Sequence, residues 1–483
     1  MTGPAARLPL GLKFVHGFGS IAYGIKDNGF STFLLLFYNQ VVGLDARLVS
    51  AALLLALVID AFADPVIGHL SDRTYTRWGR RLPWLYIAPI PLGLAWVLLW
   101  TPPSGSDTQL FFYLVATAIV VRALLSCCEV PSVALLPELT RDYDERTTLM
   151  RFRYLFGWVG GLVIAVLAYT VFLVPDATHQ VGQLNKYGYW LYGITGAIAI
   201  VVSVLLSAAG QHRRVAHWPA VRPEKSTIKK ALTEIFESFS NKAFRAYIVA
   251  AACALVSQGI TFSISNYLYL YVWEFPAYAF KLYPFILLLS VIVCFFVVGP
   301  ANRVFGKKQT AVVGSLVGVV FWTAPFWLRL AGQWPEPGSD LSTYLICAFA
   351  FGATVFSVMV MISAASMIAD IVEASEIETG RRTEGLFFAG NFFMQKCATG
   401  LGIAISGQII ALAGFPDKAI PGAVDPAVID RMMAIYGILV VVLAIAAAVL
   451  FARFPISRAD HEGRLALLGD AGRANPDASG AHP

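Results

Sequence analysis

Residues 51–81 read AALLLALVIDAFADPVIGHLSDRTYTRWGRR. The stretch opens with an apolar run of the kind that crosses a bilayer, and it closes with a loop that holds four arginines. Two acids, Asp60 and Asp64, interrupt the apolar run, and Pro65 follows directly. This order predicts a membrane-spanning helix that carries charge inside the bilayer and ends at a basic loop.

The composition of the whole chain agrees with a membrane protein. Of its 483 residues, 57% are hydrophobic and only 14% are charged, and the mean hydropathy is +0.67. A soluble domain carries roughly 25% charged residues. We therefore expect an integral membrane protein, and the net charge of +6 does not indicate nucleic-acid binding, because the basic residues lie in particular loops between apolar spans.

Each membrane helix needs about 20 predominantly apolar residues. Segments of this kind recur along the chain and predict twelve spans, near residues 14–40, 47–70, 83–101, 109–135, 153–175, 188–210, 245–272, 283–300, 309–331, 342–372, 385–414 and 430–453. The expected fold is therefore an all-α membrane protein.

The distribution of Lys and Arg sets the expected orientation, because cytoplasmic loops are enriched in both. With the N-terminus in the cytoplasm, most of the 36 basic residues fall in cytoplasmic loops and tails. The opposite side then holds only six, which are Arg47, Lys186, Lys281, Arg329, Lys418 and Arg431. We expect a multi-pass protein of the cell inner membrane with both termini in the cytoplasm.

The longest cytoplasmic loop divides the spans into two sets of six. The expected units are a bundle over 1–210, a linker over 211–244, a second bundle over 245–455 and a disordered tail over 456–483. Within the linker, apolar residues at helical spacing from Ile228 to Phe239 predict a short amphipathic helix on the membrane surface. The loop after span 8, residues 302–308, repeats the pattern of residues 72–81, so we expect two pseudo-symmetric halves of the major facilitator type.

Asp60 and Asp64 are the first candidates for function. They lie four residues apart and share one helix face, where two carboxylates repel each other unless a cation or a proton lies between them. Pro65 frees a backbone carbonyl one turn back, and oxygen ligands suit a hard cation. The pair is predicted to bind a coupling ion, H⁺ or Na⁺, and supplies the metal ligands if that ion is Na⁺; the alternative is a helix end capped near water.

Other ionisable side chains also lie within the apolar spans, where each costs about 2.5–3.5 kcal/mol on insertion scales. Arg122, Ser126 and Glu129 follow one another at helical spacing on span 4 and share a face. Lys396 is alone in an apolar run, so it needs an acidic partner. For Arg122, Glu129 and Lys396 the alternative is a structural salt bridge.

Span 1 carries the adjacent residues Lys26 and Asp27. Adjacent side chains on a helix point about 100° apart, so both cannot face one partner. We expect one to line a cavity and the other to pair with a neighbouring span.

Several of these motifs resemble the glycoside–pentoside–hexuronide:cation symporter family, which is typified by melibiose carriers. The resemblance is carried by residues 60–65, by Gly68, and by residues 72–84, which include Trp78-Gly79-Arg80-Arg81. It extends over nearly the whole chain through the segments and residues Glu129-Val130-Pro131, Arg153, Ala369-Asp370-Ile371-Val372-Glu373 and Lys396.

The resemblance implies roles for particular residues. It implies that Asp60 and Asp64 hold the coupling Na⁺, Li⁺ or H⁺ with assistance from Ser126. It also implies a sugar site that uses Glu129, where melibiose carriers have Asp, together with Lys396 and Arg153.

The sequence departs from the family pattern at the site. The ungapped position of the span-1 acid is Gly24, and Asp27 lies one turn further along the same face. Two expected aromatic positions hold Val133 and Ser357, and Ala63 stands where the cation motif often has Asn. The loss of that amide ligand weakens Na⁺ binding relative to H⁺.

The sequence thus predicts a cation-coupled symporter that imports a sugar, glycoside or hexuronide-like solute by alternating access. Asp27, Glu129, Arg153, Lys396 and Arg122 are the expected solute-binding residues, and Lys26 with Arg122 would admit an anionic solute. An alternative cargo is a lysolipid. An enzyme is not indicated, because the sequence has no nucleophile–base constellation, phosphate loop or metal motif.

The remaining expectations concern gating and partners. The charges of the 72–81 loop are expected to close the cytoplasmic side in the outward-facing state; they are Asp72, Arg73, Arg80 and Arg81. We expect a monomer that contacts the solute and membrane lipids, with no cofactor and no nucleic acid.

Overall fold

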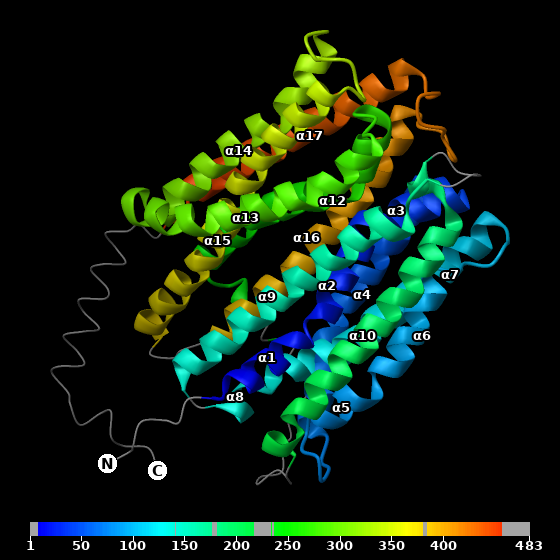
Figure 1. Ribbon diagram of the computed structural model, residues 1–483. Coiled ribbons are helices and arrows are strands. Elements are labelled where there is room, and N and C mark those ends of the chain that lie inside the picture. The colour runs from blue at the N-terminus through cyan, green and yellow to red at the C-terminus, as the bar shows by residue number, and fades with distance from the viewer. Residues whose placement is uncertain are drawn as a thin grey trace.

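The computed structural model describes residues 8–140, 142–175, 181–216, 233, 236–379 and 384–455. These residues form helices joined by short loops (Figure 1), and within them the isolated pairing of Thr76 with Gly79 is the single extended contact. The all-α fold expected from the hydropathy pattern is confirmed. The expected amphipathic helix of the linker falls largely outside the described residues, and the expected disordered tail lies outside them entirely.

Within the part of the chain that the structure describes, ten of the expected spans are single stretches that are long and apolar enough to cross a membrane. In the first half these contain α4 (Ala46–Arg73), α7 (Asp107–Ala134), α9 (Tyr143–Leu167) and α10 (Lys186–Val215). In the second half they contain α12 (Lys242–Tyr267), α13 (Ala277–Phe305), α14 (Lys307–Leu330), α15 (Asp340–Thr379), α16 (Glu384–Ala413) and α17 (Pro426–Ala452).

The two other expected spans are interrupted. Span 1 consists of α1 (Leu10–Phe18), α2 (Ile21–Asn28), the π-helix η1 (Gly29–Phe33), α3 (Leu34–Leu36) and the π-helix η2 (Phe37–Val42). Span 3 consists of α5 (Leu82–Ile87) and α6 (Pro89–Leu99). Because neither is one long helix, the total of twelve spans stays a prediction.

Shorter elements complete the connections, and polar caps fix where helices begin. The connecting elements are α8 (Leu136–Leu139) and the π-helices η3 (Ala168–Phe172) and η5 (Leu268–Val272), with a 3-10 turn η4 (Gly182–Leu184). A side-chain carboxylate or amide accepts a backbone N–H bond at the start of α4, α9, α10, α12 and α17, from Asp45, Asp142, Asn185, Asn241 and Asp425. These caps satisfy N–H groups that would otherwise lack partners at the helix ends.

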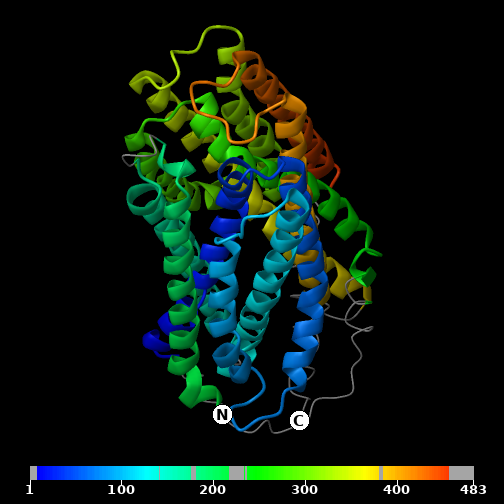
Figure 2. The same cartoon turned by 90° about the vertical axis from the view of Figure 1, so that its right-hand side faces the viewer.

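The helices form two groups. In Figure 1 the blue-to-green helices α1–α10 lie beside the green-to-red helices α12–α17, and Figure 2 shows the first group from a perpendicular direction. Between the groups, α4 packs against α16, and α13 packs against α9 and η3. If the halves are exchanged, the second span corresponds to the eighth and the fifth to the eleventh, so these two contacts are equivalent. The pairing supports two pseudo-symmetric halves.

Glycines bring span 1 against span 5. A Cβ added at Gly24 would lie 1.9 Å from the carbonyl oxygen of Gly157 and 2.7 Å from the nitrogen of Gly161. Only a residue without a side chain allows this approach, as is common between membrane helices. The close packing fixes α2 against α9 and thereby sets the position of Lys26 and Asp27.

The predicted gating residues lie at the end of the bundle that carries the basic loops, which we call the basic end. The Arg81 guanidinium lies 2.9 Å from Asp72 and 3.1 Å from Glu138. The second half has a matching pair, with Lys307 2.5 Å from Asp370. Arg73 and Arg80 are also in contact with neighbouring groups. The Arg81 and Lys307 pairs each lie within one half, so they support the helix ends of that half and do not join the two halves directly.

Candidate functional site

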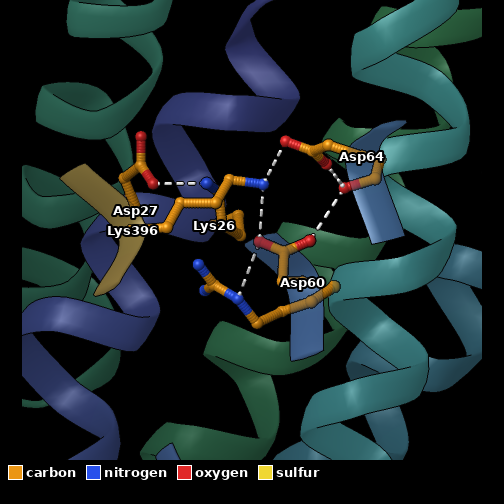
Figure 3. A network of polar contacts seen from close by, with 7 residues as sticks. Lys26, Asp27, Asp60, Asp64 and Lys396 are labelled. Carbon is orange, nitrogen blue, oxygen red and sulfur yellow. Dashed lines mark hydrogen bonds and ion pairs between the residues drawn. The ribbon is translucent and has the colours of Figure 1, made fainter. Parts of the chain in front are cut away.

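The centre of the site is an ion-paired group that joins the two halves (Figure 3). Asp60 and Asp64 lie one turn apart on α4, and Lys396 reaches them from α16. The Lys396 ammonium lies 2.8 Å from Asp60 Oδ2 and 2.6 Å from Asp64 Oδ2. The isolated lysine of span 11 and the aspartate pair of span 2 are therefore partners across the interface.

Helix α7 contributes two further groups to the same cluster. Arg122 Nε donates to Asp60 Oδ2 at 3.2 Å, and its guanidinium lies 4.9 Å from the Phe30 ring centre. Ser126 Oγ lies 2.8 Å from Asp60 Oδ1 and 2.7 Å from Asp64 Oδ1. The i, i+4 spacing of Arg122 and Ser126 turns both toward the aspartates.

Burial differs sharply within this cluster. The Asp60 and Arg122 side chains are 5% and 6% exposed, whereas Asp64 is 29% and Lys396 is 20% exposed. A charge in such a position needs a partner because water cannot solvate it. Asp60 and Arg122 thus form the enclosed part of the cluster, and Asp64 with Lys396 forms the part that water or a solute can reach.

Lys26 and Asp27 pair with each other, at 2.5 Å. The flexible lysine stem brings its ammonium to the neighbouring carboxylate although the two Cα–Cβ bonds diverge. The Lys26 side chain is 10% exposed and the Asp27 side chain is 69% exposed. Asp27 therefore presents a hydrated carboxylate next to the central cluster (Figure 3).

Glu129 and Arg153 occupy different surroundings. Lys26, Lys396, Asp27 and Asp64 are the charged groups that act on the Glu129 carboxylate, so Glu129 borders the cluster. Arg153, by contrast, donates to Ser132 Oγ at 2.6 Å and lies over the Tyr23 ring at 5.4 Å. It is buried, and its contacts include a hydroxyl and an aromatic face.

The cluster is poor in metal ligands. Among the described residues, no group of three or more His, Cys, Asp and Glu side chains is arranged to hold a metal ion. The two aspartates and the Ser126 hydroxyl are the oxygen donors at the predicted cation site, and protein donors already contact their side-chain oxygens.

Sequence reasoning missed a second polar group, at the end of the bundle opposite the basic end. This distal cluster joins the end of span 1 to the second half and consists of Asn39, Gln40, Tyr267, Tyr271 and Asp417. Asn39 donates to Asp417 at 2.6 Å and accepts from Tyr267 at 2.7 Å. Gln40 accepts the Ala419 N–H at 2.7 Å and donates to the Pro416 carbonyl at 3.2 Å.

The distal cluster closes that end of the interface. The residues of span 1 that form it, Asn39 and Gln40, are 1% and 3% exposed. Nearby, Asn266 of α12 donates to the Thr32 carbonyl at 2.8 Å and accepts from Tyr169 at 2.8 Å. The adjacent amides at the end of an apolar span, and tyrosines four residues apart on span 7, were the sequence signals for it.

Two similar helical halves, joined by ion pairs between apolar helices and closed at one end by hydrogen bonds, are the arrangement of a membrane transporter rather than of an enzyme. The chain belongs to the family described as MFS/sugar transport protein, which matches residues 15–458. It is therefore a multi-pass membrane protein of the major facilitator type.

Known relatives agree with this assignment. The chain is 26% identical to an isoprimeverose transporter of Lactiplantibacillus pentosus, over 84% of this chain and 81% of the relative. It is 26% identical to a glucuronide carrier protein homolog of Escherichia coli, over 83% of each chain. The fold also matches the xylose transporter XylE from E. coli, with a TM-score of 0.60 at 15% identity over 94% of this chain and 98% of XylE.

Proposed function

We propose that the protein is a cation-coupled symporter that imports a sugar, glycoside or hexuronide-like solute across the inner membrane by alternating access. The observation that carries the proposal is the bridge from Lys396 in the second half to both Asp60 and Asp64 in the first half. Relatives named as symporters, among them a putative glycoside/cation symporter of E. coli, support it.

Two carboxylates beside the bridge suit a polyhydroxylated solute. Asp27 and Glu129 can accept hydrogen bonds from hydroxyl groups, and Lys396, which is paired with the two aspartates, is also partly exposed. The basic groups Lys26 and Lys396 suit a solute that carries a carboxylate, such as a hexuronide. An ionic centre of this kind does not favour a lysolipid, because burying ion pairs against an acyl chain would cost free energy.

The bridge explains how a cation and a solute could act on the same movement. A cation that neutralises the aspartate pair weakens the attraction between these carboxylates and Lys396, because the Coulomb energy of an ion pair depends on both charges. The contact between α4 and α16 can then change, and the solute contacts on Glu129 and Asp27 change with it. The distal cluster holds the other end of the interface closed, and the loop pattern assigns that end to the outside.

Uptake into sealed proteoliposomes tests the proposal. Isoprimeverose and methyl glucuronide serve as labelled probes, with an inward gradient of either H⁺ or Na⁺. We expect one probe to accumulate above its outside concentration, and Lys396→Ala to reduce that accumulation at least tenfold. Lys186→Ala, at the exposed start of α10, is the matched control and should transport normally. Normal accumulation by Lys396→Ala would refute the role of the bridge.

A further inference from the structure

We infer that Arg122, acting as a fixed counter-ion to Asp60, excludes Na⁺ and Li⁺ from the aspartate pair, and that this leaves a proton, held between Asp64 and Ser126, as the coupling ion. The proton part rests on the proposed function, because it names the ion that the symporter uses. The exclusion of metal cations does not depend on transport and can be tested by binding alone.

The four carboxylate oxygens of the aspartate pair are already in contact with protein donors. Asp60 Oδ2 faces both Arg122 Nε, at 3.2 Å, and the Lys396 ammonium, at 2.8 Å. Asp64 Oδ2 faces Lys396 at 2.6 Å. The two Oδ1 atoms both face the Ser126 hydroxyl. A hard cation needs a shell of free oxygen atoms, so it would have to displace these donors.

The positive charges of Arg122 and Lys396 also oppose the binding of a metal cation. Two positive side chains balance two negative ones, so the cluster has no net negative charge to hold a metal cation. An added Na⁺ would lie within a few ångströms of an ammonium and a guanidinium in a low-dielectric region, where like charges repel strongly. A sodium site is therefore available only if one of the two cationic side chains leaves.

Arg122 is the cationic side chain that cannot easily leave or lose its charge. It is 6% exposed, with its guanidinium against the Phe30 ring at 4.9 Å. A guanidinium also stays protonated in proteins, whereas an ammonium can be neutralised when it is buried. Lys396 is more exposed, at 20%, and lies on the other half, so it is the group free to move during transport.

A proton, in contrast, fits the cluster without displacing any group. Ser126 has one hydroxyl hydrogen but lies within hydrogen-bond distance of two carboxylates, at 2.8 and 2.7 Å. If Asp64 is protonated, its O–H donates to Ser126 Oγ, and the Ser126 hydrogen is donated to Asp60. Each of the two short contacts then has its own hydrogen.

Asp64 is the better site for this proton because of its surroundings. Its side chain is 29% exposed, so water can deliver the proton, whereas Asp60 is 5% exposed and keeps the charged partners Arg122 and Lys396. Protonation of Asp64 removes one of the two carboxylates that hold Lys396. The ammonium then interacts more strongly with Glu129, which borders the predicted solute site. Proton binding thereby changes the charge that the solute meets.

The exclusion of Na⁺ is tested by thermal unfolding of the full-length purified protein in NaCl and in choline chloride at equal ionic strength. Because a ligand that binds only the folded state raises the melting temperature, we expect no Na⁺-specific shift for the wild type. Arg122→Gln should acquire a saturable upward shift of a few degrees. Arg122→Lys, which keeps the charge, and Arg153→Gln, which removes a different buried charge, should not.

A saturable Na⁺-specific shift in the wild type would overturn the exclusion, and this result needs no variant to fold. The absence of any shift in folded Arg122→Gln would overturn the role given to Arg122. Both results are independent of solute transport, so failure of the probes to enter vesicles would refute the proposed function without affecting this test.

The proton site is tested by uptake of a transported probe along an imposed H⁺ gradient. Ser126→Ala removes the shared hydrogen and should lower proton-driven accumulation at least tenfold, while Ser126→Thr restores the hydroxyl and should recover it. A purely structural role would not require the hydroxyl. Full accumulation by Ser126→Ala, or accumulation in the wild type that Na⁺ drives and H⁺ does not, would overturn the assignment.

Discussion

Asp60→Asn and Asp64→Asn provide a matched comparison, because both remove one carboxylate charge from the same helix face. Asp60 is the sole acid contacting Arg122 among the ion pairs of the described residues, and both side chains are nearly inaccessible to water. Asp60→Asn therefore leaves a buried guanidinium without its counter-ion. Asp64→Asn leaves Lys396 still paired with Asp60 at 2.8 Å and Ser126 still bonded to Asp60.

The expected magnitudes follow from these contacts. Removing one member of a buried ion pair costs about 3–5 kcal/mol, and the Asn amide oxygen can still accept from Arg122, so we expect about 3 kcal/mol for Asp60→Asn. Asp64 is partly exposed, so solvent screening reduces the loss of its ion pair to about 1 kcal/mol. The two variants should therefore differ in stability by about 2 kcal/mol.

The assay is thermal unfolding of both variants in the same detergent, compared with the wild type. Asp60→Asn should melt several degrees lower than Asp64→Asn, and the double variant Asp60→Asn/Arg122→Gln should recover part of the loss, because it removes the unpaired guanidinium as well. Equal melting temperatures for the two single variants, or a lower one for Asp64→Asn, would refute the assignment of Arg122 to Asp60.

Three further predictions concern other parts of the molecule. Gly24→Ala should prevent folding or lower the melting temperature strongly, since its Cβ would meet the Gly157 carbonyl at 1.9 Å, while Gly11→Ala, with no atom within 4 Å, should be neutral in the same melting assay. Asn39→Ala should destabilise the closed distal end, seen as faster labelling of an engineered cysteine there. Burial raises the pKa of Asp417, so the closed state should bind its proton more tightly than a hydrated open state. Labelling should therefore rise as the pH rises through that pKa, and Asp417→Asn should abolish this dependence.

The charged cluster could be predicted because one of its sequence signals is local to a helix and the other requires a partner of opposite charge. Asp60 and Asp64 share a face through helical periodicity, and a lone lysine in an apolar span must find an acid. The partner of Arg122 could not be predicted in the same way. Its helix face was clear, and it was predicted among the solute-binding residues, but which carboxylate it meets depends on how α7 packs against α4.

The interruptions of span 1 were also beyond the sequence pattern. The apolar run indicated one long helix, whereas the chain forms π-helical segments at Gly29–Phe33 and Phe37–Val42. Hydropathy reports how apolar a segment is, and it does not distinguish the backbone hydrogen-bond pattern of a π-helix from that of an α-helix. The distal cluster could not be predicted for a related reason. Its amides and tyrosines have no distinctive sequence pattern, and only the fold brings residues 39–40 and 416–419 together.

In the proposed mechanism, the Asp60–Asp64 pair couples an ion to solute movement. The most direct measurement is the internal pH of sealed proteoliposomes, recorded with an entrapped pH dye when a transported probe is added outside without any imposed gradient. Wild-type vesicles should acidify as the probe enters, and vesicles with Asp64→Asn should take up the probe downhill without acidification. Acidification of Asp64→Asn vesicles to the wild-type extent, or probe entry into wild-type vesicles without proton movement, would contradict this coupling.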